Sequence, residues 1–309
     1  MSSASLAFGA PPAGLATVSV PVPCPGMPDV DVLDTVIHHE EAGEGDPIVL
    51  LHGNPTSSYL WRDVIPGLVS EGRCLAPDLV GFGRSGKPKI DYRFVDHARY
   101  FDAWFEALGL ERVTIVGHDW GGALGFHWAS RHPDRVAAIA FFETIIKPLT
   151  WGEWPPASKD IFQRFRTAGT GEEMILDQNL FVEAVLPGAV DRKLSDEEID
   201  TYRAPFVERE SRAPTLQWPR ELPIDGEPAD VVELVEAYDR WLGSSPEVPK
   251  LLLTFDPGAI VRESVVEWCR NNIASLDIQA CGRGIHFVQE DQGPEIAEAV
   301  ASWRRRVLS

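Results

Sequence analysis

The pentapeptide GHDWG (residues 117–121) places an acidic side chain between two glycines. It follows the apolar run Val113–Val116 and precedes a stretch with helical spacing, so it lies at an expected strand-to-helix turn. A Gly-x-nucleophile-x-Gly sequence at such a turn holds its central residue on a sharp, strained corner. The first N–H groups of the next helix point towards an anion that forms there. Asp119 is therefore the candidate nucleophile; the alternative is that it only caps the helix from Trp120.

An aspartate at this corner restricts the possible reaction. A carboxylate can attack a saturated carbon and form an ester with the substrate. Attack on an amide or an ester would instead give an anhydride, so those substrates fit poorly. The sequence therefore favours alkyl halides or epoxides, and it requires a base that activates water to hydrolyse the ester.

His286 is the best-placed of the eight histidines to act as this base. It lies in a loop between the expected strand Leu276–Ala280 and the final helix, where the active sites of α/β proteins assemble. His118 belongs to the turn itself and is expected to shape it. Five others fall on expected helices or on the first strands: His38, His39, His97, His127 and His132; His52 begins the loop after the expected strand 47–51.

Two carboxylates compete to orient the imidazole of His286. Glu143 follows the apolar run Val136–Phe142, next after the nucleophile strand, and Asp256 follows the run Lys250–Phe255. Many α/β-hydrolases keep their acid at the second position, but Pro257-Gly258 also makes Asp256 a good turn residue. Spacing alone leaves both open.

Two N–H donors lie beside the expected nucleophile. Asn54 follows the expected strand Ile48–Leu51, in the position where α/β-hydrolases place their oxyanion loop. Trp120 carries an indole N–H, which can only donate a hydrogen bond. A departing halide needs donors and no proton, so these two groups are candidate halide ligands. An epoxide oxygen needs a proton as the ring opens, which Tyr202 or Tyr238 could supply.

Short apolar runs alternate with helical stretches along most of the chain, which predicts an α/β fold with a mostly parallel sheet covered on both faces. The expected strands cover 47–51, 73–76, 113–116, 136–142, 250–255 and 276–280, and the expected helices cover 94–108, 120–131 and 294–307. Residues 28–40 predict a leading hairpin before the turn cluster at 42–46. The alternation stops between 147 and 248, where aromatic residues and prolines predict a helical cap with an apolar cavity at its base. We therefore expect a main domain of residues 28–146 and 249–309, and a cap of residues 147–248.

Composition narrows the possible partners. The 309 residues carry 47 Asp+Glu against 28 Lys+Arg, a formal net charge of −19, which disfavours nucleic acid and anionic membranes as partners. No apolar run approaches a membrane span, and the scattered cysteines, which include Cys24, form no metal motif. We expect no membrane association, a cytoplasmic location, a monomer or weak homo-oligomer, and a flexible N-terminal extension over residues 1–27.

Longer motifs resemble the haloalkane dehalogenases of the α/β-hydrolase superfamily. They are HGNPTSSYLWR (52–62), PDLVGFGRSGKP (77–88), GHDWGG (117–122), FFE (141–143) and HFVQED (286–291), and the resemblance runs from about residue 30 to the end. It implies Asp119 as nucleophile, His286 as base and Glu143, not Asp256, as the acid. It also implies Asn54 and Trp120 as halide ligands, no cofactor or metal, and a small apolar halogenated substrate. The family's pocket positions correspond to Trp154, Phe162, Phe181 and Ile260.

Three other functions stay open. GHDWG is shared with epoxide hydrolases, and coelenterazine-type luciferases resemble this scaffold and its cap motifs (153–155, 177–187 and 214–224). A receptor on a hydrolase fold would bind a ligand without turnover, but no member of the expected catalytic set is missing.

Overall fold

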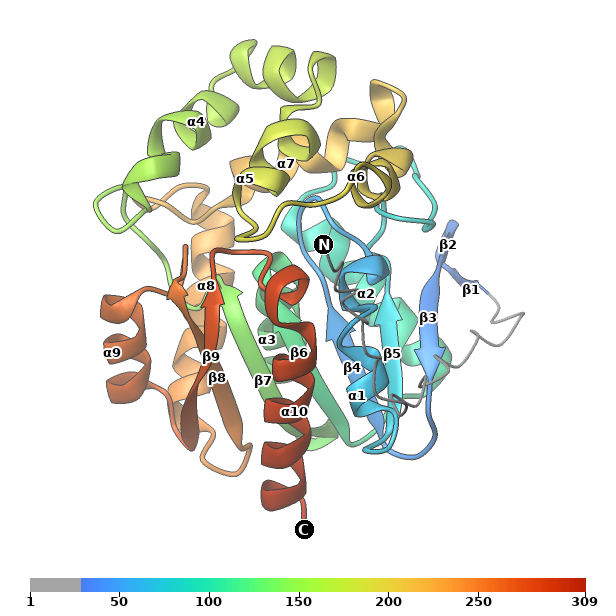
Figure 1. The fold of residues 1–309 in the computed structure, drawn as a ribbon, viewed down its shortest axis with the longest axis vertical. Helices are drawn as coiled ribbons and strands as arrows, with labels where there is room; N and C mark the ends of the chain where they lie inside the picture. The colour runs from blue at the N-terminus through green and yellow to red at the C-terminus, as the bar shows by residue number, and fades with distance from the viewer. Residues whose placement is uncertain (1–28) are drawn as a thin grey trace, which may run out of the picture.

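The computed structural model describes residues 29–309, so the expected flexible extension over residues 1–27 and Cys24 lie outside the described part. A seven-stranded sheet forms the centre, in the order β3-β5-β4-β6-β7-β8-β9 (Figure 1). All neighbouring pairs are parallel except β3 with β5. The strands are β3 (His39–Ala42), β4 (Pro47–Leu51), β5 (Arg73–Pro77), β6 (Val113–His118), β7 (Val136–Thr144), β8 (Lys250–Pro257) and β9 (Leu276–Gly284). The predicted α/β-hydrolase fold class is confirmed.

Apolar side chains on both faces of each central strand explain why the sheet is buried. In β4, Val49 and Leu51 belong to one hydrophobic cluster, whereas Ile48 and Leu50 belong to the other. Successive side chains of a strand point to opposite faces, so an unbroken apolar run must be covered on both sides. The observed strands contain all six predicted runs, and β6 and β7 extend to the residues next to the candidate site.

The first strands differ from the predicted hairpin over residues 28–40. Only β1 (Val30–Val32) and β2 (Thr35–Ile37) form a hairpin, and they make a separate two-stranded sheet. The following residues leave it, because β3 (His39–Ala42) pairs antiparallel with β5 at the edge of the main sheet. The hairpin is therefore shorter than predicted.

Two layers of helices cover the sheet. One layer contains α1 (Ile65–Leu68) and α10 (Gln289–Val307), which pack in one cluster, and the other contains α2 (Phe94–Leu108), α3 (Asp119–Arg131), α8 (Ala229–Ser244) and α9 (Glu263–Asn272). The three predicted helices correspond to α2, α3 and α10. No helix in residues 29–309 is long and apolar enough to cross a membrane.

The insertion between β7 and β8 is helical and lies over the carboxyl ends of the strands (Figure 1). It contains α4 (Pro156–Arg166), two π-helical turns (Glu172–Asp177 and Phe181–Val185), α5 (Leu186–Gly188), α6 (Asp196–Arg203) and α7 (Ala213–Glu221). Within the predicted cap range, α8 behaves differently: it packs on α3, with the rings of Phe126 and Tyr238 5.6 Å apart. We therefore propose that the cap itself ends near residue 228 and that α8 covers the sheet.

Candidate active site

Asp119 stands on a strained turn between β6 and α3. Its φ is +48°, a region in which non-glycine residues cost about 1–3 kcal/mol unless their surroundings hold them there. The hydroxyl of Thr144 donates to the carbonyl of Asp119 at 2.6 Å. Gly121 is required because a Cβ there would lie 2.3 Å from the carbonyl oxygen of His52. These contacts hold the carboxylate of Asp119 at the edge of the sheet, directed into a cavity.

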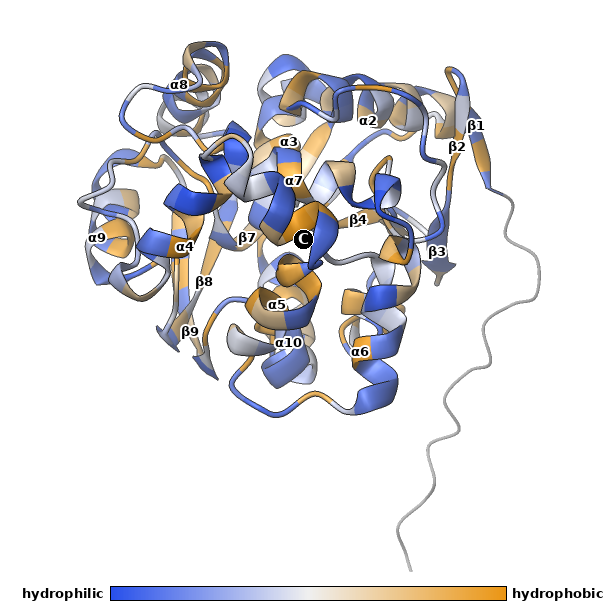
Figure 2. Ribbon diagram, turned by 90° about the horizontal axis from the view of Figure 1, so that it is seen from above, coloured by the Kyte–Doolittle hydropathy of each residue, from blue (hydrophilic) through white to orange (hydrophobic). Residues whose placement is uncertain are grey.

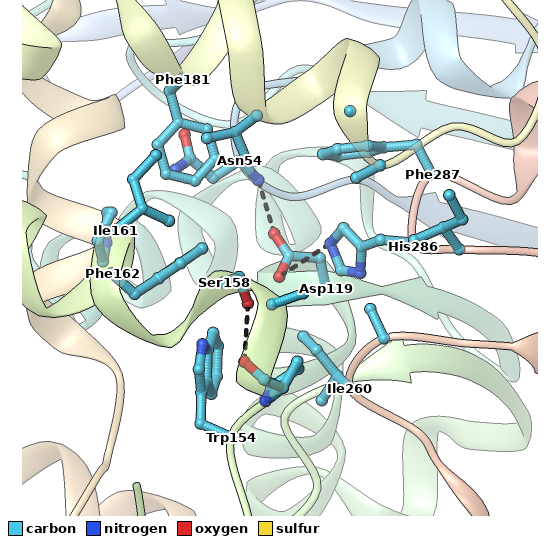
Figure 3. A pocket seen from close by; sticks show the side chains of 18 of the residues that line it. Asn54, Asp119, Trp154, Ser158, Ile161, Phe162, Phe181, Ile260, His286 and Phe287 are labelled. Atoms are coloured by element: carbon cyan, nitrogen blue, oxygen red, sulfur yellow. Dashed lines mark hydrogen bonds and ion pairs between the residues drawn. The ribbon is translucent and has the colours of Figure 1, made fainter.

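The two carboxylate oxygens of Asp119 have different surroundings. Oδ2 accepts a hydrogen bond from the backbone N–H of Asn54 at 2.8 Å, and the backbone N–H of Trp120 also donates to the carboxylate. Gly53 allows this approach, because a Cβ there would lie 2.2 Å from Oδ2. Oδ1 lies 3.7 Å from Nε2 of His286 (Figure 3). Oδ2 is therefore held by the backbone N–H of Asn54, and Oδ1 faces the imidazole.

The imidazole of His286 lies between two carboxylates. Its Nδ1 lies 3.3 Å from Oε2 of Glu143, and its Nε2 faces Asp119. With Nδ1 donating to Glu143, the neutral ring keeps a lone pair on Nε2. The 3.7 Å to Oδ1 is longer than a hydrogen bond, so Nε2 is not committed to the carboxylate.

Glu143 is held by the loop that follows β8. Its side chain is buried, its φ is +44°, and its carboxylate accepts backbone N–H groups from Ala259, Ile260 and Val261 at 2.8–3.1 Å. Asp256 is exposed at the end of β8. The structure therefore brings Glu143, and not Asp256, to His286. Pro257-Gly258 made Asp256 a candidate turn residue, and the loop that begins there lies against the carboxylate of Glu143.

Burial and neighbouring charges shift the pKa values of this group. Burial raises the pKa of Asp119, although His286 and the N–H groups of Asn54 and Trp120 oppose the rise. Burial alone would lower the pKa of His286, but the hydrogen bond to Glu143 and the charge of Asp119 outweigh it, so that pKa is raised. Burial lowers the pKa of His118, which keeps its ring neutral.

Asn54 and Trp120, the expected halide ligands, both line the cavity. The Nδ2 of Asn54 donates to the carbonyl of Thr215 at 3.3 Å, which fixes the end of the amide that carries its N–H groups and leaves the second N–H free. The indole of Trp120 stacks on Trp218 with ring centroids 4.4 Å apart, which fixes its plane.

The cavity measures about 450 Å³ and lies between the sheet and the cap. All four expected pocket residues, Trp154, Phe162, Phe181 and Ile260, line it (Figure 3). The other lining residues were not predicted from the sequence, because all but Phe287 are small or aliphatic and carry no recognisable pattern. They are Pro155, Ala157, Ser158, Ile161, Ala184, Val185, Gly188, Ala189, Pro219, Leu222, Pro257, Gly258, Ala259, Ile285 and Phe287.

Neither Tyr202 of the cap nor Tyr238 of α8 reaches this cavity. The hydroxyl of Tyr202 donates to Glu290, and that of Tyr238 donates to the carbonyl of Ile145 at 2.7 Å. Both side chains are buried, and no tyrosine is among the described residues that line the cavity. The proton donor that epoxide opening requires is therefore not found at either expected position.

Comparisons with known proteins identify the family of this chain. Residues 46–189 match the α/β hydrolase fold family. The chain is 45% identical to a haloalkane dehalogenase of Mesorhizobium japonicum, over 92% of this chain and 93% of that protein, and 46% identical to one of Bradyrhizobium diazoefficiens, over 88% and 92%. Among solved structures, the haloalkane dehalogenase DatA from Agrobacterium tumefaciens C58 is 44% identical, with a TM-score of 0.87 over 90% of this chain and 96% of that chain. The chain belongs to the haloalkane dehalogenase family.

Proposed function

We propose that this protein cleaves the carbon–halogen bond of small apolar haloalkanes with water, giving an alcohol, a halide ion and a proton. The observation that carries this proposal is the combination of a strained aspartate with an apolar cavity of about 450 Å³ whose side-chain N–H donors include the two beside the nucleophile, Asn54 and Trp120. A carboxylate nucleophile and donors for an anion are what displacement of a halide requires.

In the first step, Oδ1 of Asp119 attacks the carbon that bears the halogen. Oδ2 accepts the backbone N–H of Asn54, so Oδ1 is the oxygen available to react. The new C–O bond forms as the C–X bond breaks, and the electron pair leaves with the halide. The second N–H of the Asn54 amide and the indole N–H of Trp120 stabilise that anion, and the substrate carbon remains on Asp119 as an ester.

In the second step, Nε2 of His286 takes a proton from a water molecule, and the resulting hydroxide attacks the carbonyl carbon of the ester. The negative charge that develops on Oδ2 meets the backbone N–H of Asn54. Glu143 stabilises the imidazolium and holds the ring. The alcohol leaves, Asp119 is restored, and the proton passes from His286 to solvent.

Ester formation itself helps this second step. The charge of Asp119 is one of the causes that raise the pKa of His286. Once Asp119 is an ester, that charge is absent, so the pKa of His286 falls and the ring is more readily neutral. The nucleophile therefore sets the protonation state of the base, and it does so at the stage where the base is needed.

The decisive test follows halide release and the ester together. With 1-bromobutane, the wild-type enzyme should release bromide continuously, whereas His286→Phe should release about one bromide per active site. Mass spectrometry of the quenched variant should then find Asp119 heavier by a butyl group. No bromide release from any of a panel of brominated alkanes, or sustained turnover by His286→Phe, would overturn the proposal. Faster turnover of styrene oxide would support the epoxide hydrolase instead, and light emission with coelenterazine would support the luciferase.

We further propose that the enzyme acts as a monomer or a weak homo-oligomer, because copies of a chain with a formal net charge of −19 repel one another. Light scattering across a concentration series tests this, and a stable high-order assembly would contradict it. Its cytoplasmic location stays a prediction; the three described cysteines, Cys74, Cys269 and Cys281, are buried and free, as a reducing compartment favours.

A further inference from the structure

The backbone of His286 is held from two sides by two different parts of the molecule. On the sheet side, the Nε2–H of His118 donates to the carbonyl of His286 at 2.8 Å. On the cap side, the N–H groups of His286 and Phe287 both donate to the carbonyl of Ala189, at 3.0 and 3.1 Å. Ala189 follows α5, which lies above the amino end of α10 in Figure 1 and overlaps α10 in the view from above in Figure 2. The loop that carries the base is therefore fastened to the cap.

The same connection of the cap is bound again a few residues later. The backbone N–H groups of Asp191 and Arg192 donate to the two carboxylate oxygens of Asp291, each at 2.9 Å. The Nε of Arg192 donates to the carbonyl of Glu290 at 2.6 Å. The segment 189–192 therefore runs alongside the segment 286–291, and hydrogen bonds join the two segments at both ends.

A partly buried ionic cluster, centred on the fully buried Glu290, lies behind this contact. The carboxylate of Glu290 has a side-chain exposure of 0% and accepts from Arg62 at 2.5 and 2.7 Å, from Arg192 and from the hydroxyl of Tyr202. Glu198 binds both guanidinium groups, at 3.0 Å from Arg62 and 2.6 Å from Arg192. Two cations and two anions therefore balance, and every donor to the buried carboxylate is charged or a hydroxyl.

The members of this cluster come from both parts of the molecule. Arg62 follows β4 and Glu290 begins α10, whereas Arg192, Glu198 and Tyr202 belong to the cap. Removing one partner of a buried charge network leaves an uncompensated charge, so the cluster favours a single arrangement of the cap against α10. Because Glu290 lies four residues after His286, that arrangement also sets the position of the base.

We propose that Arg192 and Asp291 are positioning residues, which act through the 189–192 connection to hold His286 in reach of the ester. The inference rests on the proposed function and assigns a role in its second step alone. Halide displacement uses Asp119, Asn54 and Trp120, none of which touches the connection. Hydrolysis depends on where Nε2 places the attacking water, and a shift of about 1 Å can cost about a hundredfold in rate.

The test separates the two steps by rapid quench with 1-bromobutane. In Arg192→Met, we expect the bromide burst to keep its rate and amplitude, while decay of the ester slows about tenfold or more. The ester should then accumulate in the steady state, and both kcat and KM should fall. Arg192→Lys keeps the charge between Glu198 and Glu290 and should recover part of the rate. Arg209→Met is the matched control. Arg209 pairs with Asp177 within the cap at 2.7 Å and makes no ion pair with any member of the ionic cluster around Glu290.

The outcomes distinguish the two proposals. Burst amplitude counts correctly folded sites, so a variant that is merely destabilised loses amplitude and keeps its rate of ester decay. Ester decay at the wild-type rate in Arg192→Met overturns the positioning role. If that variant does not fold, Asp291→Asn provides the same test, because an amide can accept only one of the two backbone bonds. Absence of any bromide release by the wild-type enzyme contradicts the proposed function, and the positioning role falls with it; bromide release with wild-type ester decay in Arg192→Met overturns the positioning role alone.

Discussion

The floor and the roof of the cavity are built on different principles. The floor consists of the loops after the strands and carries all the proposed chemistry: Asn54, Asp119, Trp120, Glu143 and His286. Its geometry is fixed by backbone hydrogen bonds and by two residues with positive φ. The roof comes from the cap, and its aromatic rings meet only through packing; Trp154 and Phe162 lie 4.9 Å apart, and Phe162 and Phe181 lie 5.9 Å apart.

The floor and the roof should therefore tolerate substitution to different degrees. A hydrogen-bonded carboxylate at a strained corner has one arrangement, and a small displacement removes the reaction. Apolar packing accepts other side chains of similar size, usually at a cost below about 1.5 kcal/mol. Substitutions in the floor should therefore change whether the reaction occurs, and those in the roof should change which substrate reacts.

The strongest test of the floor is its nucleophile. Asp119→Asn removes the charge that attacks carbon but keeps the shape, so we expect loss of bromide release by about 10⁴-fold or more. Mass spectrometry should find no ester. The exposed Asp134→Asn is the matched control and should keep full activity. Bromide release close to wild type in Asp119→Asn would show that the chemistry lies elsewhere.

The two candidate acids give the next test. Glu143→Gln keeps size but removes the charge that supports the imidazolium, and we expect a loss of about 10²- to 10⁴-fold in ester hydrolysis. Asp256→Asn should leave the rate unchanged, because Asp256 is exposed at the end of β8. Single-turnover decay of the ester measures both. Equal losses in the two variants would contradict the assignment of Glu143.

The pH profile of ester hydrolysis should show a smaller effect than the substitutions of Asp119 and Glu143. The base must be neutral, so ester hydrolysis should fall about tenfold per pH unit below the pKa of His286. That pKa is raised in the free enzyme, partly by the charge of Asp119, which the ester removes. We therefore expect the rate of ester decay to fall at a lower pH than the pH at which His286 of the free enzyme becomes protonated. The first is measured by single turnover across pH, and the second by NMR titration. Coincidence of the two would argue against control of the base by Asp119.

The roof should show the smallest effect. Phe162→Leu enlarges the cavity under the cap, and we expect stability to change by less than about 1.5 kcal/mol. The ratio of kcat/KM between 1-bromohexane and 1-bromobutane should shift severalfold, while the rate of ester decay with either substrate stays near wild type. A loss of ester decay comparable to that of Glu143→Gln would mean that roof and floor are not separable.

Most of the fold could be predicted because its signals are local. Apolar runs buried on both faces marked the six parallel strands, and the GHDWG turn lay where β6 meets α3. The first hairpin and the end of the cap were less predictable. His39–Ala42 is a strand because β5 offers it an open edge, and α8 covers the sheet because Tyr238 packs against Phe126. Both depend on partners that are distant in the sequence.

The types of the reacting groups and their order along the chain follow from local patterns at the nucleophile turn and at the ends of strands. Spacing left two carboxylates open for His286; the family resemblance implied Glu143, and the physical reason for that choice lies in the packed structure. Glu143 and Asp256 follow neighbouring strands with similar spacing, and what separates them is the turn after β8, which presents three backbone N–H groups to Glu143. Backbone donors have no side-chain signature, and neither has the carbonyl of Ala189 on the loop of His286. Contacts of this kind arise only when distant segments pack together.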